Sequence, residues 1–365
     1  MGSWLLSQIT SPPSSSWITR GRSDSVYGEG QKSVPEPSAV LFGFAVFLAY
    51  LYAFVGGFTD AANAIATSVG TRVLSPSAAV GMAGFFNLLG GLTGTAVAVT
   101  IGKGLVDPSG LSLTTVIAGL AGAMSWSLFT YRLGIPVSET HGLVGGILGA
   151  GIATAGFEII QVQSLTKVLI AIVASPLIGF VGGLAMIVVV YWLCHRFARR
   201  KAIPMFRNLQ RLSAAYMAFS HGRNDAQTPM GVLALALSIH FGWDELTIPL
   251  WVVLSCSALA SVGTAYGGWR IIRTLGMKMT ALDSVQGFAA ETAGATVLEL
   301  ASGFGIPVST THTITSSIIG VGVTRSLNSV RWALAVEIVV SWILTLPATM
   351  IVGGCCMLLL RRLLG

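Results

Sequence analysis

A short polar segment occurs twice in this apolar chain, and it constrains the fold more than any other feature. Residues 134–141, Gly-Ile-Pro-Val-Ser-Glu-Thr-His, return at 305–312 as Gly-Ile-Pro-Val-Ser-Thr-Thr-His, with seven of eight positions identical. An aspartate motif precedes each copy: Asp60 lies 81 residues before His141, and Asp225 lies 87 residues before His312. Two motifs repeated in the same order indicate a duplicated membrane protein with its working site between the halves.

The composition indicates a helical protein that crosses the membrane several times. Only 10% of the 365 residues are charged and the mean hydropathy is +0.77, whereas a soluble domain carries roughly a quarter charged residues. The apolar stretches are nearly continuous, unlike the alternating strands of a membrane barrel. We therefore expect an all-α polytopic protein of the cell membrane, surrounded by the lipid bilayer.

The positive charges lie at the ends of the apolar stretches, so the net charge of +7 does not indicate nucleic-acid binding. Residues 196–211 hold six Lys or Arg and no acid, which predicts a basic cytoplasmic linker. Inverted halves would then place both chain ends outside, whereas Arg361 and Arg362 favour the inside for the C-terminus. We give the linker, with its six charges, the greater weight.

The chain accordingly divides into four expected parts. Residues 1–37 are rich in Ser, Pro and Gly and predict a disordered tail. Residues 38–195 and 212–365 are expected to form two transmembrane repeats on either side of the linker, inverted relative to each other if each has an odd number of spans. The expected spans are 39–56, 78–101, 113–133 and 165–194, followed by 212–238, 248–269, 287–304 and 332–360.

Each copy of the repeated segment is expected to begin a re-entrant helical hairpin. Pro136 and Pro307 fit the first turn of a helix, and the apolar remainder of about 15–18 residues is short for a span. Hydroxyls and free N–H groups at the positive end of a helix suit a tetrahedral oxyanion. The residues expected to bind this anion are Ser138, Thr140, Ser309, Thr310 and Thr311. The alternative is that these hydroxyls only cap their helices.

The aspartate motifs predict a cation site, because carboxylate and amide oxygens suit a hard cation such as Na⁺. Asp60 and Asp225 would supply the charge, since an unpaired carboxylate inside a membrane is costly. The expected cation-binding residues are Asp60, Asn63, Asn224, Asp225, Gln227 and Glu291. Two alternatives stay open: a carboxylate that carries a proton, and a structural ion pair in which Arg223 neutralises Asp225.

Four further polar residues are expected either to position the hairpins or to carry protons. Histidine changes charge near neutral pH, and an acid at a helix start is favoured by the helix dipole. These residues are Glu139, His141, His221 and His312.

With these motifs, the chain resembles the inorganic phosphate transporter (Pit) family, which includes the sodium–phosphate symporters of eukaryotes. The resemblance is carried by residues 60–63 and 222–227, by the two Pro-Val-Ser-x-Thr-His segments and by residues 267–276, and it spans about 40–360. It implies inverted repeats, an anion site between the hairpins and cation sites at the aspartates. Thr59 stands where the family has Asn, and Glu139 where it has a hydroxyl residue.

The resemblance implies a symporter that moves inorganic phosphate, free or as a metal–phosphate complex, with Na⁺ or H⁺ by alternating access. Na⁺ would bind at Asp60 and Asp225; no cofactor is expected, and a homodimer is compatible with this function. The nearest alternative is a permease for sulfate or another tetrahedral oxyanion. A passive channel would not need paired carboxylates. An intramembrane hydrolase with Ser309, His312 and Asp225 is disfavoured, because one catalytic centre does not need duplicated motifs. We therefore expect that the chain is not an enzyme.

Overall fold

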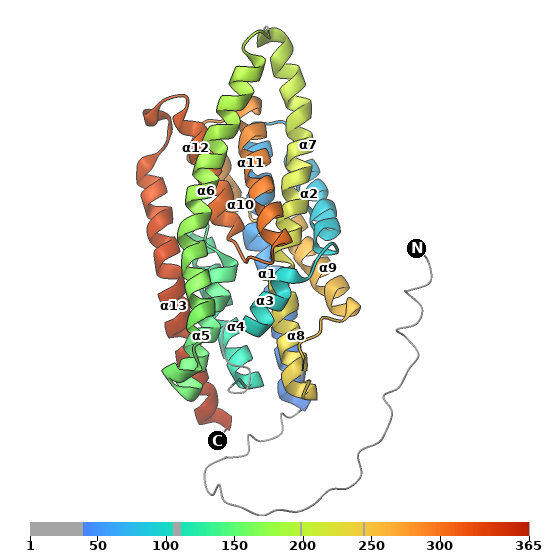
Figure 1. The fold of residues 1–365 in the computed structure, drawn as a ribbon, viewed down its shortest axis with the longest axis vertical. Helices are drawn as coiled ribbons and strands as arrows, with labels where there is room; N and C mark the ends of the chain where they lie inside the picture. The colour runs from blue at the N-terminus through green and yellow to red at the C-terminus, as the bar shows by residue number, and fades with distance from the viewer. Residues whose placement is uncertain (1–38, 105–110, 198, 244, 365) are drawn as a thin grey trace, which may run out of the picture. The chain divides into compact units, whose positions relative to one another are not determined.

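The computed structural model describes residues 39–104, 111–197, 199–243 and 245–364, which are nearly all helical. The expected disordered tail, residues 1–37, lies outside the described part. The α-helices are α1 (Ala39–Gly70), α2 (Pro76–Gly91), α3 (Ala96–Gly104), α4 (Leu113–Leu133), α5 (Glu139–Ala155), α6 (Val162–Cys194), α7 (Arg199–Asp225), α8 (Gln227–Phe241), α9 (Leu250–Tyr266), α10 (Trp269–Arg273), α11 (Ser284–Gly303), α12 (Thr310–Val323) and α13 (Trp332–Leu364) (Figure 1).

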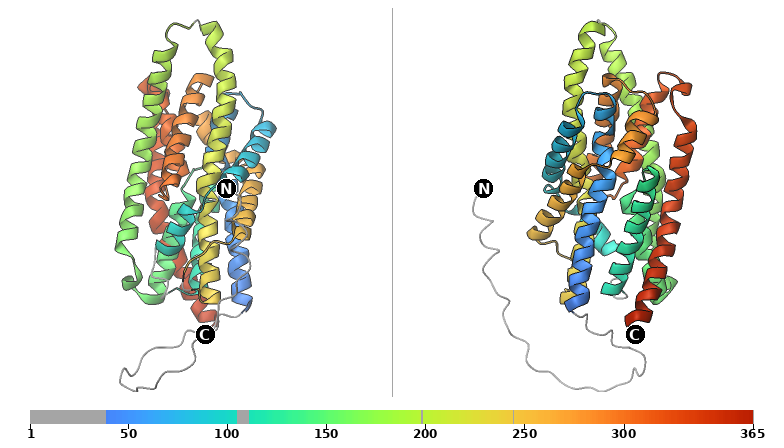
Figure 2. Two further views of the ribbon diagram at one scale, coloured as in Figure 1. Left: turned by 45° about the vertical axis from the view of Figure 1, so that its right-hand side comes forward. Right: turned by 180° about the vertical axis from the view of Figure 1, so that it is seen from behind.

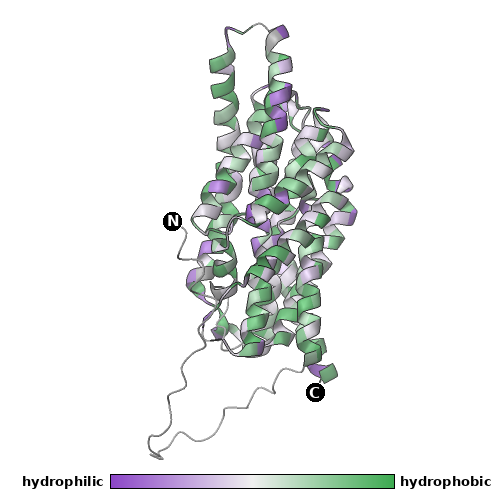
Figure 3. Cartoon of the chain, turned by 90° about the vertical axis from the view of Figure 1, so that its right-hand side faces the viewer, coloured by the Kyte–Doolittle hydropathy of each residue, from purple (hydrophilic) through white to green (hydrophobic). Residues whose placement is uncertain are grey.

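Several of these helices are candidate membrane spans. By length and composition, four helices in the described residues qualify: α1, α4, α6 and α13. Two bent pairs, α2 with α3 and α9 with α10, would add two spans if each crosses as one broken helix. Apolar residues cover most of the helices, and hydrophilic patches lie midway along them and near the turn between α6 and α7 (Figure 3). These features match a polytopic membrane protein, as the composition predicts.

Some expected boundaries are wrong. The span expected to end at residue 56 continues through Asp60, because α1 runs unbroken to Gly70. The span expected over 78–101 breaks between α2 and α3, which meet at 73°. Residues 199–211, expected as linker, are the first turns of α7.

The two aspartates sit in different helical contexts because of one proline. Pro229 has no N–H, so it cannot bond the carbonyl of Asp225 four residues earlier, and α7 gives way to α8 at Ala226. The residue four positions after Asp60 is Ala64, which keeps its N–H, and α1 continues. The sequence signal for an interrupted helix is therefore present in the second half only.

The halves interlock, and their contacts match in pairs. The short helix α5 packs against α13 of the other half, and α12 packs against α6 (Figure 2). Likewise α1 packs against α9, and α7 against α2. Each half therefore completes the surroundings of the other, and the chain between residues 39 and 364 does not separate into two independent domains.

Glycines beside the aspartates allow the closest of these contacts. A Cβ on Gly57 would lie 2.0 Å from the carbonyl oxygen of Ala260 on α9, and a Cβ on Gly222 would lie 2.1 Å from that of Asn87 on α2. Each glycine stands three residues before its aspartate. Backbone-to-backbone contact therefore fixes α1 and α7 one turn away from the two carboxylates.

Gly222→Ala is expected to destabilise the protein by about 1–3 kcal/mol, because the methyl group forces α2 and α7 apart. Gly81→Ala on α2 is the matched control: its Cβ meets no atom within 4 Å, so the better helix propensity of Ala should leave stability unchanged or slightly raised. Melting temperatures of the purified variants in detergent measure both. Equal melting temperatures would contradict the close crossing of α2 and α7.

Candidate functional site

Each repeated segment forms an extended stretch followed by a short helix. Gly134 and Gly305 take left-handed conformations, with φ of 74° and 67°, and turn the chain after α4 and α11. Ser138 and Ser309 then act as N-caps, because their Oγ atoms accept the backbone N–H of the histidine three residues on, at 3.3 and 3.1 Å. The capping role expected as the alternative is therefore present.

The prolines of these segments lie outside the helices. Pro136 and Pro307 each precede the capping serine by two residues, so the expectation that they occupy the first helical turn is wrong. Trp342 on α13 donates an indole hydrogen bond of 3.0 Å to the carbonyl of Pro136. The extended stretch before α5 is therefore held by a helix of the other half.

The starts of α5 and α12 meet inside the protein. The hydroxyl of Thr311 lies 3.1 Å from the carbonyl oxygen of Val137. The rings of His141 and His312 make an edge-to-face contact at 5.0 Å, and His312 stacks on Trp342 at 4.1 Å. The structure thus brings the two expected anion-binding segments together, and both buried histidines pack where α5 and α12 meet.

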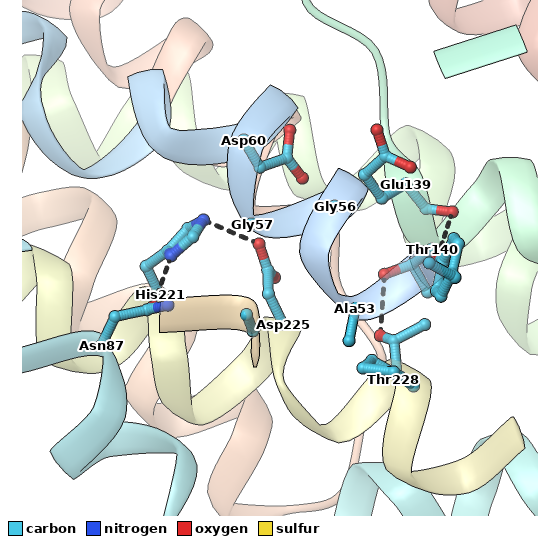
Figure 4. A pocket seen from close by; sticks show the side chains of 13 residues that line it. Ala53, Gly56, Gly57, Asp60, Asn87, Glu139, Thr140, His221, Asp225 and Thr228 are labelled. Carbon is cyan, nitrogen blue, oxygen red and sulfur yellow. Dashed lines mark hydrogen bonds and ion pairs between the residues drawn. The ribbon is translucent and has the colours of Figure 1, made fainter. Parts of the chain in front are cut away.

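The two signature aspartates also meet. One ligand atom each from Asp60, Asp225 and His221 lie within 4.8 Å of one another, and Figure 4 shows all three side chains around one space. Asp60 is 5% exposed and the Asp225 side chain 16%. Two charges at that separation repel by about 3–4 kcal/mol at an effective dielectric constant of about 20. The pair therefore requires a proton or a metal cation between its members.

His221 is oriented by a chain of hydrogen bonds. Thr264 donates to the carbonyl of Ala260, so it accepts from the Asn87 amide group at 3.0 Å. The Asn87 oxygen then faces His221 Nδ1 at 2.8 Å, which places a hydrogen on Nδ1. His221 Nε2 lies 2.9 Å from Asp225 Oδ2 (Figure 4). The imidazole is therefore held close to this carboxylate.

No arginine neutralises the aspartate pair within the described residues. The expected alternative, an ion pair of Arg223 with Asp225, is wrong because Arg223 pairs with Glu299 on α11. The residues around the pair line a cavity of about 20 Å³, and none of them is Lys or Arg. The lining is Tyr52, Ala53, Gly56, Gly57, Asp60, Asn87, Glu139, Thr140, His221, Asp225, Thr228, Pro229 and Ala260. A space of this size holds one occupant about as large as a water molecule.

Two threonine hydroxyls connect the hairpin start to both aspartates. Thr310 donates to Asp225 Oδ2 at 3.0 Å, and Thr311 lies 3.1 Å from Asp60 Oδ1. The amide group of Asn63 donates to both hydroxyl oxygens, at 3.2 and 2.9 Å, which leaves the hydroxyl hydrogens for other acceptors. The Thr311 hydrogen has two acceptors at the same distance, Asp60 and the carbonyl of Val137. Asn63 Oδ1 is buried and accepts no hydrogen bond from the described residues, which leaves it available as a cation ligand.

In the first hairpin the corresponding contacts use different residues. The hydroxyl oxygen of Thr140 lies 3.4 Å from that of Thr228. Thr228 follows Asp225 by three residues, which is the position that Asn63 holds relative to Asp60. Sequence analysis missed Thr228, although aligning the two aspartates reveals its position. Thr140 is therefore tied to the second half, as Thr311 is to the first.

The two departures from the family pattern form one contact. Thr59 donates to Glu139 Oε1 and Ser127 donates to Oε2, each at 2.6 Å. Tyr52 donates to the backbone carbonyl of Glu139 at 3.0 Å. The carboxylate is thus held by two hydroxyls at the edge of the same cavity (Figure 4). Ser127, which anchors this acid, carries no sequence signal.

Two of the expected cation ligands, Gln227 and Asn224, make hydrogen bonds to other parts of the chain. The oxygen of Gln227 accepts the N–H groups of Val97 and Ala98, at 2.7 and 3.2 Å, and thereby caps the start of α3. Asn224 donates to Asp225 and to the carbonyl of Val308, both at 2.9 Å. Gln227 therefore positions the start of α3, and Asn224 contacts Asp225 and the chain at Val308; their role as cation ligands stays a prediction.

Glu291 belongs to a separate cluster. Its carboxylate is fully buried and accepts hydrogen bonds from Thr67 at 2.6 Å, from Gln210 at 3.1 Å and from Ser213. Three donors from α1 and α7 satisfy this acid without Asp60 or Asp225. The expectation that Glu291 binds a cation stays a prediction.

A family model, named relatives and a solved structure that are similar to this chain are all described as phosphate transporters. The family model described as the phosphate transporter family matches residues 56–203 and 195–353. A Rhizobium meliloti (strain 1021) protein named a probable low-affinity inorganic phosphate transporter is 46% identical over 85% of this chain and 94% of its own length. A Bacillus subtilis (strain 168) protein of the same name is 38% identical, with the same coverage. A solved structure, "The sodium-dependent phosphate transporter", superposes with a TM-score of 0.79 at 26% identity, covering 88% of this chain and 99% of that one.

Thr59 and Glu139 are expected to be energetically coupled. Thr59→Val leaves the buried carboxylate without one donor, at a cost of about 1–3 kcal/mol, and Glu139→Thr removes that cost. The double variant should therefore be more stable than the sum of the single effects by about 1 kcal/mol. Reversible denaturation in mixed micelles measures the four free energies of unfolding.

The control cycle pairs Glu139→Thr with Thr67→Val. Thr67 is also on α1 and donates to a different buried acid, Glu291, so the two effects should add to within about 0.5 kcal/mol. Additivity in both cycles would contradict the pairing of Thr59 with Glu139.

Proposed function

This chain belongs to the phosphate transporter family, and we propose that it is a secondary active symporter that moves inorganic phosphate with a cation by alternating access. Its membership confirms the resemblance drawn from the paired motifs. Its relatives are named as transporters, which confirms that the chain is not an enzyme. The low-affinity transporters among these relatives support inorganic phosphate as the substrate.

The observation that carries the proposal is the contact between Asp60 and Asp225. These carboxylates come from opposite halves and lie close together in a cavity without Lys or Arg among its lining residues. A phosphate anion brought near them adds further negative charge. A bound cation offsets both, so cation and phosphate favour each other's binding, which is the thermodynamic requirement of a symporter.

Thr310 and Thr311 supply a physical route for this coupling between cation and phosphate. Thr310 donates to Asp225, and the Thr311 hydroxyl lies within hydrogen-bond distance of Asp60. A cation that binds the carboxylate oxygens takes the place of the hydroxyl hydrogens, which then turn to donate to an oxyanion. The proposed order is therefore cation first and phosphate second.

Phosphate is proposed to bind between the starts of α5 and α12. The hydroxyls there come from Ser138, Thr140, Ser309, Thr310 and Thr311. The first N–H groups of both helices supply further donors at the positive ends of the helix dipoles. The cavity of about 20 Å³ is smaller than a phosphate ion, so the hairpin starts must separate to admit one. The buried half-helices α5 and α12, with 17 and 14 residues, suit re-entrant hairpins.

Alternating access is proposed to follow from two inverted repeats. Each hairpin helix packs on the last helix of the other half, α5 on α13 and α12 on α6. A rocking motion of one half therefore carries the opposite hairpin start with it. Inverted repeats have two equivalent arrangements of this kind, one open to each side.

Na⁺ is the first candidate for the coupling ion. Its proposed ligands are the carboxylates of Asp60 and Asp225 with the free oxygen of Asn63, a set of hard oxygen donors. The structural neighbour named as sodium-dependent supports this choice. H⁺ is the second candidate, favoured by the 2.9 Å distance between His221 Nε2 and Asp225 Oδ2, which would let the two groups share a proton.

Sulfate is the alternative anion, because hydroxyl and N–H donors alone do not distinguish tetrahedral oxyanions. Protonated phosphate carries a hydroxyl that needs an acceptor, and Asp60 or Asp225 can accept it; sulfate at neutral pH has no such donor. Excess sulfate should therefore leave uptake of labelled phosphate unchanged. Equal competition by sulfate would move the assignment to a general oxyanion permease.

Asp60→Asn and Asp225→Asn are each expected to abolish cation-driven accumulation of phosphate in proteoliposomes while the protein remains folded. Removing one carboxylate relieves the repulsion in the pair, so melting temperatures should not fall. NaCl should raise the melting temperature of the unmodified protein relative to choline chloride, and each variant should lose this effect, because ligand binding to the folded state stabilises it.

Asp283→Asn is the matched control. Asp283 caps α11 through hydrogen bonds of 3.0 Å to Val285 and Gln286, and Asn caps helices equally well. Uptake by this variant should equal that of the unmodified protein. Normal uptake by both Asp60→Asn and Asp225→Asn would overturn the proposed site.

A further inference from the structure

A groove lies between the ends of α6 and α7, away from the aspartate pair. Its volume is about 830 Å³, and the start of α11 and the turn after α1 complete it. Its walls are part apolar, with Val190, Tyr191, Ile203, Phe206, Leu282 and Val285, and part polar, with Thr71, Arg72, His195, Arg207, Asp283 and Ser284. In Figure 1 these two helices rise past their neighbours and join at the top of the view.

Two arginines line the groove without a partner of their own. Arg72 and Arg207 are exposed, and neither side chain makes a hydrogen bond or ion pair with the described residues. Asp283, an acid in the same lining, already caps α11. His195, also in the lining, contacts the carbonyl of Trp192 through Nδ1 and accepts a hydrogen bond from Arg196 through Nε2. Arg72 and Arg207 carry two positive charges and the Asp283 carboxylate carries one negative charge, so the charged side chains of the lining sum to +1.

The backbone at Arg72 is strained. Its φ of 58° lies in the left-handed region, where the described part of the chain otherwise has only glycines. This conformation follows the end of α1, a position that glycine usually fills because it has no Cβ. Arg72 adopts it and lines the groove beside Thr71.

The groove lies at the level where the apolar part of the helices ends. The candidate span in α6 ends at Cys194, and the groove includes the last turn of that span. Trp192 beside it is 71% exposed, as expected for an aromatic residue at the boundary between hydrocarbon and water. Below the groove, exposed Val188 on α6 and Leu212 and Tyr216 on α7 continue the apolar surface.

We propose that this groove binds one anionic glycerophospholipid, with its phosphate between Arg72 and Arg207 and its acyl chains along α6 and α7. Basic pockets between membrane helices are suited to acidic lipid head groups. The apolar part of the walls favours a lipid over free phosphate, because free phosphate has no apolar part to bury. The proposal requires a membrane location but not phosphate transport, so it stands or falls independently of the proposed function.

Native mass spectrometry of the purified protein tests the proposal, with palmitoyl-oleoyl phosphatidylglycerol and the matching phosphatidylcholine as probes. The unmodified protein should retain one phosphatidylglycerol in preference to phosphatidylcholine. Arg72→Gln with Arg207→Gln should weaken this retention by about 30-fold. Each arginine is expected to contribute a similar factor to the binding of an anionic lipid, and the two factors multiply. Arg200→Gln with Arg211→Gln is the control, because both residues are on α7 but outside the groove lining, and it should bind like the unmodified protein.

Ala202→Trp provides a second test that keeps both charges. Ala202 lines the groove, and an indole there should exclude the lipid while Arg72 and Arg207 remain. Three results would overturn the proposal: equal retention of both lipids, unchanged retention by the Arg72/Arg207 variant, or displacement of phosphatidylglycerol by millimolar inorganic phosphate. The last result would make the groove a site for free phosphate.

Discussion

The repulsion between two buried carboxylates is the constraint on which the rest of this structure depends. Asp60 and Asp225 come from helices of opposite halves, yet their oxygens share one small cavity with an imidazole and no Lys or Arg in its lining. Such a pair is stable only with a cation or proton between its members. The site therefore combines the two halves and has a built-in need for positive charge, and in the proposed cycle the cation that meets this need also offsets the charge of phosphate.

The fold maintains this unfavourable contact through helices that cannot easily move apart. Gly57 and Gly222 let α1 and α7 touch the backbones of α9 and α2, one turn before each aspartate. The hairpin helices pack across the halves, so separating the carboxylates would also disturb α5 and α12. The Asn63 amide contacts the hydroxyls of Thr310 and Thr311, and these hydroxyls contact the carboxylates. In the proposed cycle, these contacts connect the charge of the pair to the surface that would hold the anion.

Much of this arrangement could be predicted from the sequence, because repetition of motifs survives without knowledge of tertiary contacts. The helical class, the family and the importance of the two aspartates follow from composition and from paired motifs. The partners of individual amides do not: Gln227 stands next to the signature like a ligand, but its oxygen caps α3, which folds back from more than a hundred residues away. Glu291 likewise finds three donors on other helices. Thr59 and Glu139, two separate departures in the sequence, prove to be one contact only when α1 and α5 pack.

The most direct test of the central claim is phosphate accumulation by the purified protein in proteoliposomes, with Na⁺ and pH gradients imposed separately. The account predicts that an inward cation gradient drives phosphate above its equilibrium distribution, with Na⁺ sufficient at constant pH. Accumulation driven only by a proton gradient would assign the Asp60–Asp225 pair to H⁺ instead. Phosphate entry that equilibrates at the same rate with or without either gradient would contradict the account, because the carboxylate pair would then have no part in coupling.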